Sequence, residues 1–274
     1  MKAGSKPGIS PASFSPLFTR QFHICVTIEE PQEKQLRAAP SQHLAGEASP
    51  MPRINFHQQL AALKDKLLAM AALSQQALEF SIEGYLARDM ALCDHVLEIE
   101  EAINTAETTV DDMAYDLLAK EQPMAIDLRF ILSVIKINGD LERIGDQAAN
   151  IAERAQLLRN TPKVDLPPEI EIMGEKTGVM IRTAIQALLE ADAKMADLVL
   201  SLDDEVDDMN RTVQAGLAER MQLQPEISIQ ALNAILISRN LERAGDHATN
   251  IAEDVIFWLR GSDVRHKLSL TEAD

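Results

Sequence analysis

The chain has 274 residues, enough for one large domain or two modest ones. Its hydrophobic content of 46% supports an ordinary buried core, and the aromatic content of only 4% favours helices over sheets. The net charge of −17 argues against nucleic acid as a ligand, because phosphates need Lys and Arg as partners. The same charge favours cations and basic protein surfaces.

The two cysteines, Cys25 and Cys93, show neither a metal-binding nor a redox spacing, which is typical of a protein from a reducing compartment. No apolar run in the sequence approaches the roughly 20 residues that are needed to span a bilayer. We therefore expect a cytoplasmic protein that reaches a membrane only indirectly, through a partner.

Residues 1–52 differ in composition from the rest of the chain. They contain seven prolines, with Gly and Ser between them, and such a proline density leaves no room for a helical period. We expect a disordered N-terminal extension here, and Met51 is an alternative start of translation that would remove it. Residues 262–274 are expected to form a flexible polar tail.

From residue 53 onward, apolar residues recur at intervals of three and four, which predicts amphipathic helices. Pro123 and Pro225 are placed in the first turns of two of them, and Gly261 is placed as a C-cap. The expected helices span about 54–87, 89–119, 123–159, 169–190, 192–221 and 225–260.

Residues 160–168 contain three prolines and are the clearest linker in the chain. The order of elements then repeats, so the sequence predicts an all-α fold. Its six helices form two similar three-helix bundles, residues 53–160 and 167–261.

One stretch occurs twice, at the same place in each half. Residues 141–153 read LERIGDQAANIAE and residues 241–253 read LERAGDHATNIAE, with ten of thirteen positions identical. The Glu, Asp, Asn and final Glu of each copy are spaced i, i+4, i+8 and i+11, which places them on one stripe of a helix. A glycine in the middle of each copy, Gly145 and Gly245, is interpreted as a point of close helix approach.

Carboxylate and amide oxygens in such a stripe are the ligands of hard cations. Like charges four residues apart destabilise a helix, and a bound cation would offset this repulsion. We expect the preceding helix of each bundle to supply further ligands, with more carboxylates at the second site than at the first. The predicted metal ligands are Glu142, Asp146 and Asn150 with Glu100 and Asn104 at the first site, and Glu242, Asp246 and Asn250 with Asp203 and Asp207 at the second.

Two other interpretations of these stripes stay open. An acidic stripe opposite an apolar one is also what any solvated surface helix shows, so the chain could be a structural helical module. A metal-dependent enzyme or a metal store on a helical bundle is the other alternative. No Glu-x-x-His pair of the di-iron enzymes lies on the motif helices, and the chain has no phosphate-binding loop or nucleophile motif, so we predict no catalytic residues.

With its two motifs, and with QPMAIDLRFILSVIKINGDLERIGD at 122–146, the sequence resembles the PhoU family of bacterial phosphate-signalling regulators over about residues 54–261. The resemblance implies two similar three-helix bundles that bind metal ions (Fe, Zn, Mn or Mg) at the acidic motifs, and no enzymatic activity. It further implies a homodimer that couples the high-affinity phosphate ABC transporter, through its ATPase, to a sensor histidine kinase. Such a protein represses the phosphate-starvation response and controls phosphate uptake.

Overall fold

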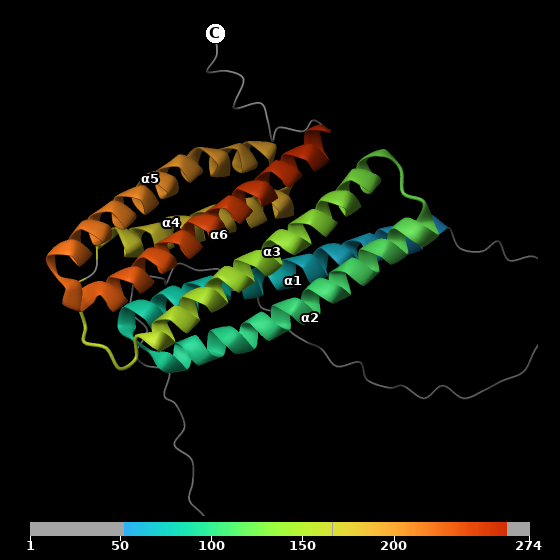
Figure 1. Cartoon of the computed structure of the whole chain (residues 1–274). Coiled ribbons are helices and arrows are strands. Elements are labelled where there is room, and N and C mark those ends of the chain that lie inside the picture. Colours follow the sequence, from blue (N-terminus) through green and yellow to red (C-terminus); the bar gives the residue numbers. More distant parts are fainter. Residues whose placement is uncertain (1–51, 166, 262–274) are drawn as a thin grey trace, which may run out of the picture. The chain divides into compact units, whose positions relative to one another are not determined.

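The computed structural model describes residues 52–165 and 167–261, and the expected disordered extension and flexible tail lie outside the described residues. The described part contains six α-helices and one short 3₁₀ helix (Figure 1), which confirms the predicted all-α fold. All six α-helices belong to one compact unit, residues 49–274. Their bounds are α1 (Pro52–Ala87), α2 (Met90–Glu121), α3 (Ala125–Leu157), α4 (Glu169–Glu190), α5 (Ala193–Leu223), η1 (Pro225–Ile227) and α6 (Ser228–Arg260).

The helix ends follow local sequence signals. Asp89 and Asp192 are equivalent N-caps of α2 and α5, and each side chain accepts hydrogen bonds from backbone N–H groups of the first turn. Gly261 ends α6 in the left-handed conformation, with φ of 69°, as expected of a C-cap glycine. The two prolines that were predicted to lie in the first turn of a helix differ in the structure. Pro225 is the first residue of η1, whereas Pro123 precedes α3, which begins at Ala125.

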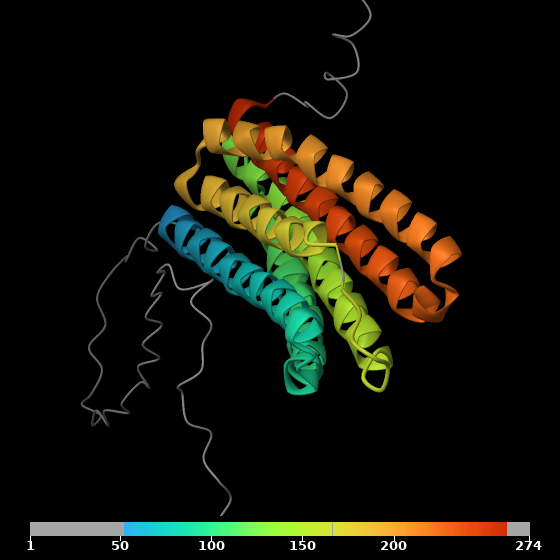
Figure 2. The same ribbon diagram turned by 90° about the vertical axis from the view of Figure 1, so that its left-hand side faces the viewer.

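The helices form two three-helix bundles that share one hydrophobic core. α2 packs on α1 and α3, and α5 packs on α4 and α6, while α3 contacts α6 and α1 contacts α4 across the two halves. Figure 2 shows α1 and α4 on one side of this unit and α3 and α6 on the other. α3 and α6 run antiparallel, because Ser133 near the start of α3 donates to the carbonyl of Asp254 near the end of α6 at 2.9 Å.

Each motif helix is fixed to the helix behind it by a buried hydroxyl. Ser74 of α1 donates to the carbonyl of Leu141 at 2.9 Å, and Thr177 of α4 donates to the carbonyl of Leu241 at 3.3 Å. Both hydroxyl-bearing residues are fully buried. Leu141 and Leu241 directly precede the first acids of the motifs, so these bonds set the register at which the acidic stripes leave the core.

Long side chains hold the linker between the two halves. Arg88, at the α1–α2 turn, donates to the carbonyls of Leu158, Thr161 and Pro162. From the second half, Gln230 donates to the carbonyl of Pro162 at 3.3 Å and Arg220 to that of Asp165 at 2.8 Å. The linker is therefore bonded to both bundles.

The two mid-helix glycines differ in their surroundings. A Cβ on Gly145 would lie 2.8 Å from the Cδ1 atom of Ile103, which is fully buried on α2, so α2 approaches α3 closely here as expected. A Cβ on Gly245 would lie 3.7 Å from its nearest neighbour, an atom of Met180, which is ordinary van der Waals contact. Close approach therefore explains Gly145 but not Gly245.

We predict that Gly245→Ala raises the free energy of unfolding by up to about 1 kcal/mol, because alanine is the better helix former and its methyl group fits. Gly145→Ala should be less stable than Gly245→Ala by roughly 1–3 kcal/mol, the usual cost of overpacking a core. Urea denaturation of the two variants and the wild type checks both values. Equal stabilities of the two variants would contradict the structural difference.

Candidate metal centres

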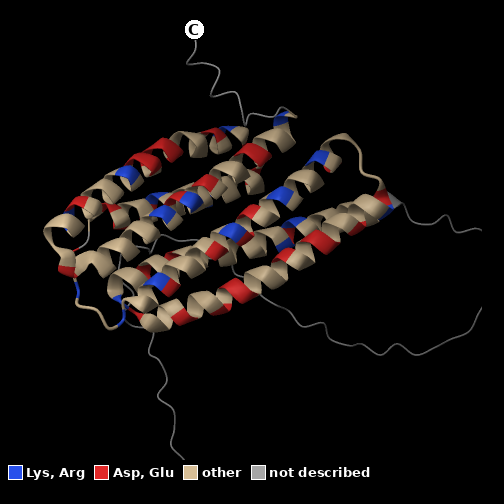
Figure 3. Cartoon of the chain, viewed as in Figure 1, with Lys and Arg blue, Asp and Glu red and all other residues tan. Residues whose placement is uncertain are grey.

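The acidic stripes of α3 and α6 face the helices that flank them. Glu142 and Asp146 lie half-buried beside α2, and Glu242 lies half-buried and Asp246 exposed beside α5. Figure 3 shows acidic positions recurring along α2 and α5 and mixed with basic ones on α3 and α6. Each half of the molecule therefore brings acids of two helices together, as the sequence predicted.

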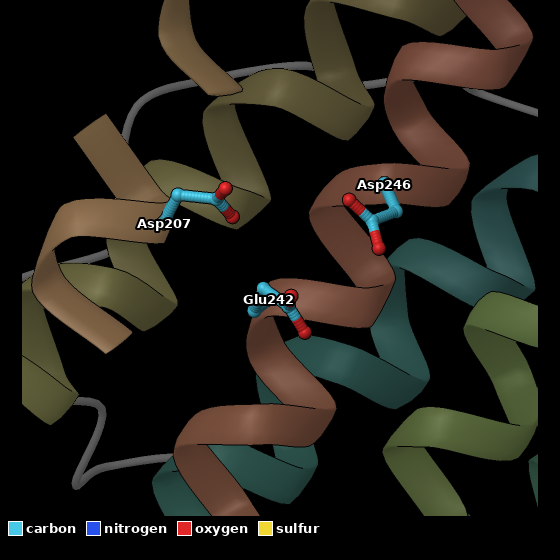
Figure 4. A group of neighbouring side chains, drawn as sticks. All are labelled: Asp207, Glu242 and Asp246. Atoms are coloured by element: carbon cyan, nitrogen blue, oxygen red, sulfur yellow. The ribbon is translucent and has the colours of Figure 1, made fainter. Parts of the chain in front are cut away.

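The second cluster is the tighter one. One carboxylate oxygen each of Asp207, Glu242 and Asp246 lies within 4.8 Å of the other two. Figure 4 shows the Asp207 carboxylate of α5 pointing toward the two acids of α6. Thr249 of α6 donates to Asp203 Oδ1 at 3.2 Å and so ties that acid of α5 to the same interface.

Burial and the mutual repulsion of the carboxylates both raise the pKa values of the acids in this cluster. Burial, followed by the neighbouring charge of Asp246, raises the pKa of Asp203 above its ordinary value. Burial and the charges of Asp246 and Asp207 raise the pKa of Glu242, and burial and Asp207 raise that of Asp246. A cation placed between these groups would relieve both causes.

The first cluster is more open. Burial, followed by the charges of Asp146 and Glu107, raises the pKa of Glu142, and burial followed by Glu100 raises that of Asp146. Within residues 52–165 and 167–261, no three carboxylate, imidazole or thiol ligand atoms of this cluster come as close together as those of the second. Asn104 donates to Glu100 at 2.6 Å, and Asn150 is exposed.

The first cluster also contains Glu107, an acid of α2 that was not among the predicted ligands. Burial, followed by the charges of Asp111 and Asp146, raises the pKa of Glu107, so its carboxyl group lies within the field of both. Glu107 follows Glu100 by seven residues, two helical turns, and this spacing was a signal that could have identified it. With Glu107 included, each cluster contains four acids, and among the described residues only the second has three that converge within 4.8 Å of one another; the greater number of carboxylates at the second site stays a prediction.

Polar side chains lock the flanking helices beside both clusters. Asn138 of α3 donates to the carbonyl of Glu107 at 2.9 Å and to Asp111 Oδ1 at 3.0 Å. In the second half, Ser238 of α6 donates to Asn210 Oδ1 of α5 at 3.0 Å. These contacts fix the register of α2 and α5 against the motif helices.

The structure places Asn250 at the α3–α6 interface. Its amide donates to Asp140 Oδ1 at 3.2 Å, and His247 Nδ1 lies 2.9 Å from the same oxygen. Asp140 is 8% exposed, so this contact between the two halves is nearly buried. Asn250 is thus bonded to α3, while Asp207, Glu242 and Asp246 gather on the α5 side of α6.

The donor sets fit hard cations. Both clusters offer carboxylate oxygens from two helices, which is the chemistry that Mg²⁺, Mn²⁺ and iron ions accept. The preorganised group of Asp207, Glu242 and Asp246 meets the requirement that several oxygen ligands converge. Other ligand positions of a bound ion would be open to water or to a partner.

Comparisons with known proteins agree with this architecture of two helical repeats, each with one acidic cluster. The family model described as the PhoU domain matches twice, at residues 67–155 and 170–255. The phosphate-specific transport system accessory protein PhoU homolog of Pseudomonas aeruginosa is 37% identical over 212 residues, which cover 77% of this chain and 88% of that relative. PhoU homolog 1 of Thermotoga maritima is 32% identical over 222 residues, 80% of this chain and 95% of that relative.

Two solved structures share the fold. The crystal structure of PhoU from Pseudomonas aeruginosa superposes with a TM-score of 0.74 at 36% sequence identity. The matched region covers 76% of this chain and 100% of the Pseudomonas chain. The phosphate transport system regulatory protein PhoU from Streptococcus pneumoniae has a TM-score of 0.71 at 23% identity, with 76% of this chain and 99% of that one covered. The fold and the repeated motifs define an all-helical protein with two PhoU domains. The chain belongs to the PhoU family.

The raised pKa values predict how stability depends on pH in the absence of metal. A carboxyl group whose pKa is raised by folding binds its proton more tightly in the folded state, so its ionisation destabilises the fold as the pH rises. The double variant Glu242→Gln plus Asp246→Asn should therefore have a higher Tm than the wild type at pH 7 in EDTA. The difference should shrink as the pH falls toward the ordinary values of 4.5 and 3.8.

Thermal unfolding followed by circular dichroism measures this difference. The matched control is Glu101→Gln plus Asp112→Asn, which neutralises two exposed acids of α2 away from the raised groups. A double cluster variant that is less stable than the wild type at pH 7 would contradict the repulsion.

Proposed function

We propose that this chain is a cytoplasmic accessory protein of a phosphate transport system that binds metal ions through its two acidic clusters. The observation that carries the proposal is the convergence of Asp207, Glu242 and Asp246 in a chain of the PhoU family. The names of its relatives, phosphate-specific transport system accessory proteins, support the first part.

The metal ion has a physical task in this proposal. Acids with raised pKa values lie between pairs of helices in both halves, and their mutual repulsion works against helix packing. A bound divalent or trivalent ion (Fe, Zn, Mn or Mg) would hold α2 against α3 and α5 against α6. Metal binding would then stabilise the bundle by binding the folded state alone.

The proposed role is regulatory. The chain would contact the ATPase of the phosphate ABC transporter and a sensor histidine kinase, repress the phosphate-starvation response when phosphate is plentiful, and control phosphate uptake. It would act as a homodimer and would have no catalytic activity. None of the helices in the described residues is long and apolar enough to cross a membrane.

Metal loading tests the first part of the proposal. Wild-type protein incubated with Fe, Zn, Mn or Mg and then desalted should retain metal, measured by elemental analysis. Asp246→Ala should lower the metal content more than Asp146→Ala does, because the second cluster is preorganised. Asp112→Ala, which removes an exposed acid of α2, is the control. Wild type without metal under all four conditions would contradict the proposal.

Deletion of the gene tests the regulatory part. In cells grown in high phosphate, loss of the protein should release the starvation response and raise alkaline phosphatase activity. Full-length protein supplied in trans should restore repression. Repression that is unchanged by the deletion would overturn the regulatory role and leave the metal-binding result untouched.

A further inference from the structure

A cavity lies beside the linker that joins the two halves of the chain. Figure 1 shows the linker, drawn in yellow, at the end of the unit where α1 ends and α6 begins. The cavity has a volume of about 450 Å³, which is within the range of small-molecule sites. The ends of α1 and α3, the linker and the first turn of α6 contribute its walls, and the two acidic clusters contribute no residue to it.

The wall of this cavity carries more positive than negative charge, although the chain has a net charge of −17. Arg88 and Lys163 line it, with Asp165 as the one carboxylate among the lining residues that the structure describes. Neither cation forms an ion pair with a carboxylate of residues 52–165 or 167–261. Arg88 instead donates to three backbone carbonyls, which hold its guanidinium in place. An anion in the cavity would therefore meet fixed positive charge without displacing a carboxylate.

Two buried polar groups in the wall have unused hydrogen-bonding capacity. Tyr85 and Gln230 are each 4% exposed, and within the described residues neither the Tyr85 hydroxyl nor Gln230 Oε1 has a hydrogen-bond partner. Gln230 Nε2 donates to the carbonyl of Pro162 at 3.3 Å, so the amide is held with its oxygen left as an acceptor. Burial raises the pKa of Tyr85, and the charge of Arg88 lowers it. The hydroxyl is therefore a protonated donor in the field of the guanidinium.

The rest of the wall is apolar. Leu158 is buried, and Leu86 and Val164 are half-buried. A bare inorganic anion would pair with the cations and leave the apolar surface and the Gln230 acceptor unused. A cation would be repelled by Arg88 and Lys163, and a neutral ligand would leave their charges uncompensated. The wall therefore favours a ligand that combines an anionic group with an apolar part.

We propose that this cavity binds a small organic anion that carries an apolar body and an N–H donor. Its anionic group contacts Arg88 and Lys163 and accepts from the Tyr85 hydroxyl, and its N–H group donates to Gln230 Oε1. Its apolar body covers the leucine and valine side chains of the wall. Such a ligand touches α1, the linker and α6, and so bridges the two halves. The inference goes beyond the proposed function, because it uses none of the acids of the metal clusters.

Titration of the full chain with three organic anions that carry an N–H donor tests the inference. The probes are N-acetylphenylalanine, indole-3-acetate and adenosine monophosphate, each paired with its uncharged counterpart: N-acetylphenylalaninamide, indole-3-acetamide and adenosine. Inorganic phosphate is the anion without an apolar body. Calorimetry up to millimolar ligand should show that at least one organic anion binds. It should bind roughly ten-fold more tightly than its uncharged counterpart and than inorganic phosphate, because hydrogen bonds to charged groups are the stronger ones.

Two substitutions locate the ligand. Tyr85→Phe removes a hydroxyl without a partner in the described residues, so thermal unfolding of the ligand-free protein should not fall, whereas binding should weaken roughly ten-fold. Its control is Tyr115→Phe, which changes the other tyrosine of the chain, 53% exposed on α2. Lys163→Gln changes an exposed side chain and should also weaken binding, which keeps the test valid if Tyr85→Phe does not fold. Its control is Lys194→Gln, an exposed position at the start of α5.

Three results would overturn the inference and leave the proposed function standing. The first is that none of the three anions binds. The second is that an uncharged counterpart or inorganic phosphate binds as tightly as the organic anion. The third is wild-type affinity in a folded Tyr85→Phe or Lys163→Gln variant, because the ligand would then lie elsewhere. Failure of the proposed function is seen separately, in the metal content and in the deletion strain.

Discussion

The packing of α3 and α6 is the constraint on which the rest of the structure depends. The apolar side of each motif, with Leu141, Ile144, Leu241 and Ala244, is fully buried, and this burial holds the opposite, acidic side against a flanking helix. Hydrophobic burial is non-directional and strong enough to keep carboxylates near one another despite their repulsion. The clusters are thus held at helix interfaces by the core beneath them, which is the condition for a preorganised ion site.

The two halves are alike in fold and unlike in their sites. A tight group of three carboxylates gathers in the second half, whereas the first half has a looser set that extends along α2 through Glu107. Between them, Asp140 of the first half accepts from Asn250 and lies beside His247 of the second. A change in the position of α6 at the second cluster would therefore be felt by α3, because a nearly buried polar contact joins the two motif helices.

Most of the fold followed from local patterns. Apolar periodicity, two Gln-Pro breaks and the linker placed all six helices to within a few residues, and the i, i+4 spacing placed each stripe on one side of its helix. The partners of the stripes were harder to predict, because they depend on how neighbouring helices are rotated. Glu107 shares a helix face with Glu100 by spacing, but its place beside Asp146 also depends on how α2 packs on α3. Asn250 fits the stripe by spacing, yet its amide is bonded to Asp140. Gly245 has space around it that no sequence pattern records.

The linker joins the two repeats in one chain, and it is held by Arg88, Gln230 and Arg220. This covalent connection determines how a mutation affects the two acidic clusters. In a dimer of identical subunits, one mutation alters both sites at once. Here both repeats lie in one polypeptide, so a mutation alters one site and spares the other. Such differences are found at equivalent positions of the two repeats. Glu107 of the first repeat corresponds to Asn210 of the second, and Gln147 corresponds to His247. Because the two repeats are joined in one polypeptide, each acidic cluster can change in sequence without a matching change in the other.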